Sequence, residues 1–300
     1  MAREKTARDC GTRAVNRRSF LGAAGAGIVG VFGVSVLAAG VADATDYRTI
    51  TVPAGETRTF SVGSGQTFEN ALIDMTAEGA SARIDASGDD WTVRNVAFAG
   101  NHPGGHYLFT PAVSTGGTAR VENLYMGDGQ TARSGKGAIR VNGRDHYGTL
   151  NVHNVHVAHF IDNGLHGTDH GYSYRGRRGG VVNVHDSYFD SNNVSNVRVG
   201  SPDGRTCHVE NCVVKGGDTR PCGVGCSAPG TTTSRGVWAW WGPVEVTDSD
   251  VGGSPAGVEQ DGRAGNPEII SENTRWGYDA DTSRVPAGVP MTAEAAVGGR

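Results

Sequence analysis

The chain has 300 residues, of which 47 are glycine and 7% are aromatic, and its formal net charge at pH 7 is −4. Residues 1–44 hold six of the 27 basic and three of the 31 acidic residues, which leaves 21 against 28 and a net charge near −7 for the remainder. This acidic balance argues against nonspecific binding to nucleic acid. High glycine and few aromatic residues fit many short strands and turns.

Residues 1–44 have the features of an export signal. Arg17 and Arg18 precede an apolar run rich in Gly and Ala, 22–40, and Ala-Asp-Ala at 42–44 has the small-x-small form of a cleavage site. The paired arginines resemble a twin-arginine signal, which a receptor recognises and which is not an anchor. The run is long enough for a membrane span, but its glycine content disfavours stable insertion. We expect an extracellular or cell-surface protein, and the sequence leaves open whether the signal is cleaved or kept.

A repeated phrase, Val-x-Asn or Val-x-Asp within alternating residues, runs through the next part of the chain. Its clearest copy is Val152-His153-Asn154. The copies recur every 25 to 37 residues, a period typical of stacked coils. Seven unrelated strands of a β-sandwich are the alternative. The polar residues of the seven copies are Asn95, Asn123, Asn154, Asp186, Asn211, Asp248 and, in a degraded copy, Asn273.

Alternation inside each copy predicts two short strands that meet at a tight bend. Val93 and Val96 both fall at inward positions, so the parity jumps by one at Asn95. Asn tolerates the left-handed backbone that such a bend needs, and its amide can bond to the copies above and below. We therefore expect a ladder of Asn and Asp side chains that point inward along one bend.

A third strand, led by Gly or Asn, follows each bend, as in Gly164-Leu165-His166. Leu165 and its counterparts face inward, so the next residue of each copy faces outward. The outward residues predict one exposed strip of Arg140, His166, Arg198, Trp238 and Glu259, and a parallel strip of Asn142, Thr168, Gly200, Trp240 and Asp261.

Three short strands per coil, an Asn ladder and a Gly-led third strand resemble the right-handed parallel β-helix of the pectin-lyase-like superfamily, over roughly residues 50–278. We expect one all-β domain, 45–278, of about seven to nine coils, and a loosely packed or disordered tail, 279–300. Lyases, hydrolases, esterases, tailspikes and adhesins share this fold, so the resemblance specifies fold more than activity. The chain lacks the triple-aspartate pattern of the polygalacturonase-like hydrolases and the arginine-proline signature of the pectate lyases.

The resemblance implies that the sheet of third strands carries a substrate cleft. Indole faces stack on sugar rings, and Arg matches a carboxylate bidentately. Loops 142–147 and 169–178 add Arg, Tyr and His beside the strip, so we expect a monomer that binds an acidic, uronate-containing polysaccharide. A solvated face with ion pairs is the alternative. The candidate binding residues are Trp238, Trp240, Glu259, Asp261, Asn142, Thr168, His170 and Arg175.

β-Elimination is the expected reaction on such a polymer. A base removes the proton beside the carboxylate, and a cation or Arg stabilises the enolate-like charge. Arg198 and His166 are the candidate bases, and Arg140 is the candidate holder of the carboxylate. An Arg base needs unusual activation, because guanidinium holds its proton tightly.

Other readings of the same residues remain open. A non-catalytic adhesion solenoid could use the same strip, and a glycoside hydrolase with Glu259 and Asp261 about 6–7 Å apart ranks third. The sequence specifies no cofactor with certainty. Calcium is a candidate, because lyase relatives use it and Asp162 and Asp190 lie in loops that lead to the strip.

Four cysteines follow the export signal. Cys207 and Cys212 fall at inward positions, so core packing is the expected role. Cys222 and Cys226 lie in a Gly-rich insertion, 215–235, and we expect them to form a disulfide in an exported protein. A zinc knuckle of all four is the alternative, with loose spacing.

Overall fold

The structure is a computed structural model. The predicted export signal, 1–44, and the cysteines of the predicted disulfide, Cys222 and Cys226, lie outside the residues that it describes. Within the described part, no helix is long and apolar enough to cross a membrane. The described residues are 47–131, 135–167, 179–217, 221, 230–233, 235–252, 258–261 (backbone only), 267–277 and 279–298.

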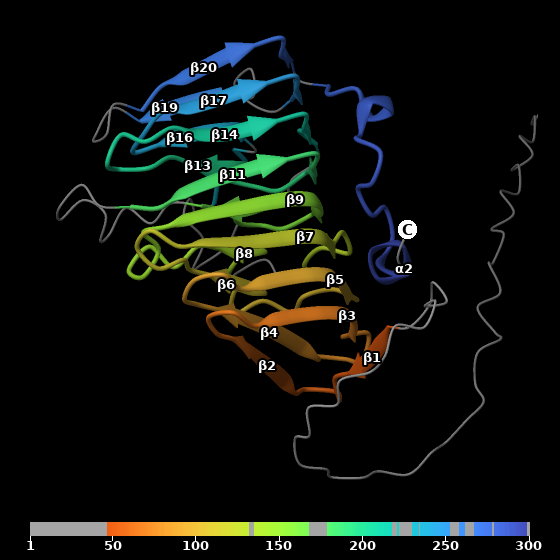
Figure 1. Ribbon diagram of the computed structural model, residues 1–300. Helices are drawn as coiled ribbons and strands as arrows, with labels where there is room; N and C mark the ends of the chain where they lie inside the picture. The colour runs from red at the N-terminus through yellow and green to blue at the C-terminus, as the bar shows by residue number, and fades with distance from the viewer. Residues whose placement is uncertain are drawn as a thin grey trace, which may run out of the picture. The chain divides into compact units, whose positions relative to one another are not determined.

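The strands form a parallel β-solenoid, as the repeat predicts (Figure 1). A 13-stranded sheet supplies two sides of the stack. In some coils one strand continues through the bend, and in others a separate strand follows it. The first side is, in stacking order, β1 (Arg48–Thr51), β3 (Thr67–Asp74), β5 (Thr92–Ala99), β7 (Thr118–Met126), β9 (Thr149–Ala158), β11 (Val181–His185), β14 (Cys207–Glu210), β17 (Val244–Thr247) and β20 (Ile269–Glu272). The separate strands after the bend are β12 (Tyr188–Asp190), β15 (Val213–Lys215), β18 (Asp250–Val251) and β21 (Arg275–Trp276).

An 8-stranded sheet supplies the third side of the turns. The solenoid has about six turns, slightly fewer than the seven to nine predicted. In stacking order the strands of this second sheet are β2 (Thr57–Val62), β4 (Ser81–Ala86), β6 (Phe109–Pro111), β8 (Ile139–Arg140), β10 (Leu165–His166), β13 (Ser195–Val199), β16 (Arg235–Trp240) and β19 (Val258–Asp261).

The interior is one continuous apolar core, built from the positions that the alternation predicts. Trp91, Val93 and Phe98 are at most 1% exposed. Each such side chain contributes roughly 1.5–3 kcal/mol by leaving water. Cys207 and Cys212 belong to the same core as free thiols, as predicted, and burial raises their pKa to about 11 and about 12.

The predicted bends have the left-handed backbone, with φ between 47° and 54° at all seven positions and at an eighth, Asn70, that the repeat did not identify. Asn95 donates to Asn70 at 2.9 Å, and Asn211 donates to Asp186 at 2.7 Å. The predicted inward orientation is wrong: Asn95 is half-buried and Asn211 is exposed. Arg94 faces outward, and the left-handed backbone of Asn95 turns its own side chain outward as well. The ladder of Asn and Asp side chains therefore runs along the surface of the bend.

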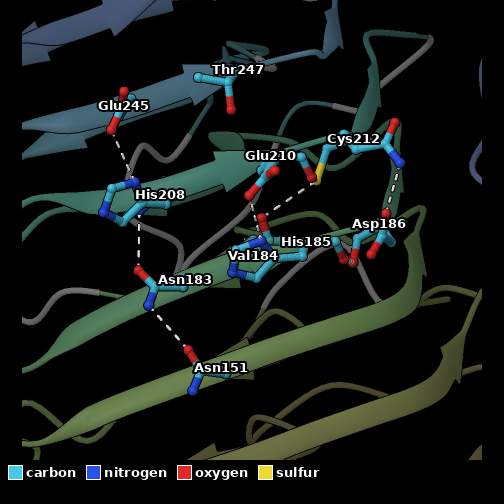
Figure 2. A network of polar contacts seen from close by, with 12 residues as sticks. Asn151, Asn183, Val184, His185, Asp186, His208, Glu210, Cys212, Glu245 and Thr247 are labelled. Carbon is cyan, nitrogen blue, oxygen red and sulfur yellow. Dashed lines mark hydrogen bonds and ion pairs between the residues drawn. The ribbon is translucent and has the colours of Figure 1, made fainter.

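A second ladder crosses the outer face of the 13-stranded sheet (Figure 2). Asn183 donates to Asn151 at 3.0 Å and accepts from the backbone of His208 at 3.2 Å. His208 and His185 each lie 3.1 Å from a Glu carboxylate of the next strand. These contacts on the half-exposed outer face align the strands, and each contributes little to the free energy of unfolding.

The C-terminal segment packs on the solenoid, so the predicted loose packing of 279–300 is wrong for the residues described. It holds a short 3-10 helix, η1 (Thr282–Arg284), and the helix α2 (Ala293–Val297), beside the strands that follow the bends (Figure 1). Ala296 is fully buried, and its carbonyl accepts from Asn123 at 2.8 Å. Composition did not indicate this contact, because small Ala side chains can pack closely on a sheet without showing a helical period.

Glycine precedes third strands because the loop that leads into the third strand of the next coil leaves no space for a side chain. A Cβ on Gly137 would lie 2.0 Å from the carbonyl oxygen of Asn163, and one on Gly164 would lie 2.7 Å from Asn192 Nδ2. The Gly-led pattern in the sequence therefore reports close approach between successive turns.

His146 is a buried group whose titration should affect stability. Its Nδ1 accepts from the backbone of Val113 at 3.1 Å, and Nε2 donates to Val181 O at 3.2 Å. Burial lowers its pKa to about 4. The unfolded chain protonates near pH 6.5 while the folded chain stays neutral, so the free energy of unfolding should fall, as pH drops from 6.5 to 4, by about 3 kcal/mol from this group.

We expect His146→Gln, whose amide can replace both hydrogen bonds, to reduce this acid-dependent loss. Urea unfolding at pH 7 and pH 4 measures it, with His185→Gln as the control on the outer face. Equal pH dependence in the wild type and His146→Gln would contradict the prediction.

Candidate functional site

The second sheet brings the predicted strip into register. Arg140 pairs with His166, His166 with Arg198, Arg198 with Trp238, and Trp238 with Glu259, on β8, β10, β13, β16 and β19. These pairings confirm the predicted alignment of the five residues. Parallel strands place consecutive side chains of the strip about 5 Å apart.

The predicted exposure of the strip is wrong for its central residues. Arg198 is 2% exposed, His166 4% and Trp238 8%, while Arg140 is half-buried. Alternation gives the direction of a side chain relative to the core, but the outward face carries an apolar cluster of its own. That second cluster consists of Ile161, Val194, Trp238, Trp240 and Trp241.

Arg198 lies within this cluster. Its guanidinium carbon is 3.3 Å from the ring centroid of Trp240 and 4.7 Å from that of Trp238. Within the described residues its side chain forms no hydrogen bond or ion pair, and its Nε is buried without a partner, as is Nε1 of Trp238. Buried polar atoms without partners are rare in native proteins, so these two donors form a candidate site for the acceptor oxygens of a ligand.

The surroundings of Arg198 disfavour its charged form. Burial, above all, lowers its pKa to about 9; Asp162 and Tyr107 oppose the shift, and Arg140 and Arg235 add to it. Arg235 also stacks on Trp238, 4.2 Å from its ring centroid, and burial lowers its pKa as well. Arg140, Arg198 and Arg235 together make the centre of the strip electropositive. Because its pKa is lowered, Arg198 holds its proton less tightly than an ordinary Arg.

Tyr107 and Asp162 face this basic centre. The Tyr107 hydroxyl donates to Asp162 Oδ2 at 2.9 Å, and the Arg140 guanidinium lies 5.5 Å from the Tyr107 ring centroid. Asp162 Oδ1 accepts from Asn163 at 2.8 Å, and Asn163 accepts from Ser195 at 2.6 Å. Burial raises the pKa of Tyr107, and the carboxylate of Asp162 raises it further.

Two residues of the second cluster have strained backbone. Val194 has φ 56° and Trp241 has φ 72°, a region that is unfavourable for bulky and especially β-branched residues. Asn193 holds Val194 in place, accepting from its backbone N at 2.9 Å and from that of Thr233 at 2.9 Å. Strain of this kind gathers at functional sites.

The remaining predicted site residues have mixed outcomes. Asn142 is exposed, and its side chain closes a local turn by donating to Asp145 at 2.7 Å, so it does not extend the strip. Trp240 pairs with Asp261, but the side chains of Glu259 and Asp261 are outside the description. The predicted binding residues Thr168, His170 and Arg175 lie outside the described residues.

The two aspartates proposed as calcium ligands do not act together. Asp190 accepts from Tyr188 and Ser191 and lies 3.3 Å from Lys215 Nζ, on the side of the turn after the bend. Asp162 belongs to the strip through Tyr107. Among the residues described, no group of three or more His, Cys, Asp or Glu side chains is arranged to hold a metal ion.

Sequence reasoning missed Tyr107 and Arg235 as site residues. Tyr107 precedes β6, whose turn carries no Gly-led copy of the third strand. Arg235 pairs with Ser195, which is fully buried, so alternation would direct Arg235 inward. Its place at the start of β16 lets the side chain reach the Trp238 ring instead.

Comparisons with protein-family models, curated proteins and solved structures find no match for this chain.

Proposed function

We propose that this protein binds an acidic, uronate-containing polysaccharide along the strip from Arg140 to Glu259 and cleaves it by β-elimination. The observation that carries the proposal is Arg198, a nearly fully buried guanidinium that lacks a polar partner in the described part of the chain and stacks on two indoles. A uronate supplies both acceptor oxygens for such a buried donor and a sugar face for the aromatic rings.

The proposed roles follow from charge and neighbours. Arg198, with its pKa lowered to about 9, takes the proton beside the carboxylate when neutral. Arg140 is half-buried at the edge of the cluster and holds the carboxylate, so that the enolate-like charge develops against a cation. His166 is the alternative base, because its strand β10 lies between β8, which carries Arg140, and β13, which carries Arg198.

A non-catalytic carbohydrate-binding solenoid is the second candidate function. The unpartnered indole N–H of Trp238 favours sugar binding whether or not chemistry follows. The two candidates differ in one respect: only the lyase needs a base that becomes neutral in an accessible pH range.

The test is the ultraviolet absorbance of the unsaturated uronate product while the chain, expressed from residue 45 onward, acts on polygalacturonate, alginate and other polyuronates. Assays with and without calcium and at several salt concentrations separate metal dependence from electrostatic attraction. A signal with any polyuronate that disappears in Arg198→Ala is expected. Binding without a signal would assign the protein to the second candidate, and the absence of both would refute the proposal.

Trp238→Phe should weaken binding about fivefold, because the ring remains under the guanidinium while the N–H is lost. Calorimetry with polyuronate fragments at pH 6, where Arg198 is protonated, measures the affinity without rapid cleavage. Trp276→Phe is the matched control, since that indole N–H donates to Ser271 at 2.9 Å, on β21 at the end of the stack. Equal affinity of Trp238→Phe and the wild type would contradict a contact to this N–H.

A further inference from the structure

Elimination also needs a proton donor, and the position of Tyr107 supplies one. When the bond between C4 and the glycosidic oxygen breaks, the departing oxygen is an alkoxide, a strong base that leaves slowly unless it is protonated. Tyr107 is 7% exposed and lies beside the strip, with the Arg140 guanidinium over its ring at 5.5 Å. Its hydroxyl is directed at Asp162, which is itself 1% exposed.

We propose that Tyr107 is the general acid of the proposed elimination and protonates the leaving glycosidic oxygen. This inference rests on the proposed function and adds a residue to it. Asp162 orients the phenol through the 2.9 Å hydrogen bond, and Asn163 and Ser195 connect Asp162 to the start of β13, the strand that carries Arg198. One chain of hydrogen bonds thus links Tyr107, the acid, to β13, the strand that carries Arg198, the base.

The electrostatics of the two side chains agree with these roles. Burial and Asp162 raise the pKa of Tyr107, so the phenol keeps its proton at a pH where the guanidine of Arg198 has begun to lose its own. Environments that move two neighbouring pKa values apart are typical of acid and base pairs. An alkoxide is a stronger base than an ordinary phenolate, and the raised pKa of Tyr107 narrows this difference, so the phenol gives up its proton only as the charge develops on the leaving oxygen.

The step balances without another reactant. The proton on C5 moves to an Nη atom of Arg198, and the electron pair of that C–H bond forms the C4=C5 double bond. The bond between C4 and the glycosidic oxygen breaks, and the oxygen takes the Tyr107 proton. The phenolate, stabilised by the Arg140 cation, then recovers a proton from protonated Arg198, which restores both groups.

The experiment compares two substrates with Tyr107→Phe, which keeps the ring under Arg140. The first is the polyuronate that the wild type cleaves best. The second is the matching uronate with 2,4-dinitrophenolate as the leaving group on C4, which departs without a proton. We expect kcat to fall about 100-fold on the polymer and less than about threefold on the activated uronate, with KM little changed on either.

Tyr125→Phe is the matched control, because that hydroxyl donates to Asp128 at 2.7 Å in the same Tyr–Asp arrangement on the outside of β7, away from the strip. It should leave both rates unchanged. An equal loss of rate on both substrates in Tyr107→Phe would mean that Tyr107 only positions Asp162 and Arg198, and an unchanged rate on the polymer would also overturn the inference. If the wild type cleaves neither substrate, it is the proposed function that fails, and the inference fails with it.

Discussion

Replacing Arg198 by alanine is expected to lower kcat/KM for polyuronate cleavage about 1,000-fold, within the range for loss of a general base. The same replacement removes the unpaired buried cation, so substrate affinity should fall too. Arg94→Ala is the matched control, because Arg94 pairs at 2.6 Å with Glu69 on the outer face of the other sheet. Thermal unfolding of both variants separates loss of activity from loss of fold.

The pH dependence tests the role more sharply than the loss of rate. Arg198 must be neutral to accept a proton, so kcat/KM of the wild type should rise with pH and level off above about 9. Lys has a lower ordinary pKa than Arg, and burial lowers it further, so Arg198→Lys should retain partial activity and move this limb to lower pH. The charged and titratable groups around the guanidinium, which remain in the variant, are Tyr107, Arg140, Asp162, His166 and Arg235.

Two results would contradict Arg198 as the base. An unchanged limb in Arg198→Lys would show that another group titrates. A limb near the ordinary pKa of His that is lost in His166→Gln would assign the base to His166 instead. Either result would leave the elimination itself in place and change only the residue that carries it.

Asn192→Leu is expected to reduce the free energy of unfolding by roughly 3–5 kcal/mol, because it leaves several buried polar groups without partners. Asn192 is fully buried between β12 and β13. Its Oδ1 accepts from the backbone of Phe160 at 3.1 Å, and its Nδ2 donates to Val157 O at 3.0 Å and to Asn196 at 2.8 Å. Leucine has a similar volume and none of these bonds.

Asn183→Leu is the control for this effect, because Asn183 makes two hydrogen bonds of the same kind on the half-exposed outer face. Water can replace them, so a loss within about 1 kcal/mol is expected. Urea unfolding compares the two variants with the wild type. Equal losses for Asn192 and Asn183 would show that the buried amide network does not contribute more than the surface ladder.

Local sequence patterns predict the strands and bends but not the burial of the polar residues near Asn192. The alternation around Val93 and Val96, and the jump at Asn95, specify strands, bend and stacking period, because each depends only on neighbours in the chain and on the steric limits of the backbone. The run from Asp190 to Asn196 interrupts that pattern with polar residues. Its burial could not be read from it, since a buried amide and an exposed one have the same local sequence signature.

The sequence by itself therefore determined the parallel solenoid, its inward apolar residues and the alignment of Arg140, His166, Arg198 and Trp238, because a periodic chain that stacks on itself repeats its register. Only the tertiary structure decided that this strip is buried, that Arg198 lies against two indoles, and that Tyr107 and Asp162 join it. Burial, pKa and the contacts of loop residues depend on which distant segments meet in space. Alternation along one strand contains no information about those segments.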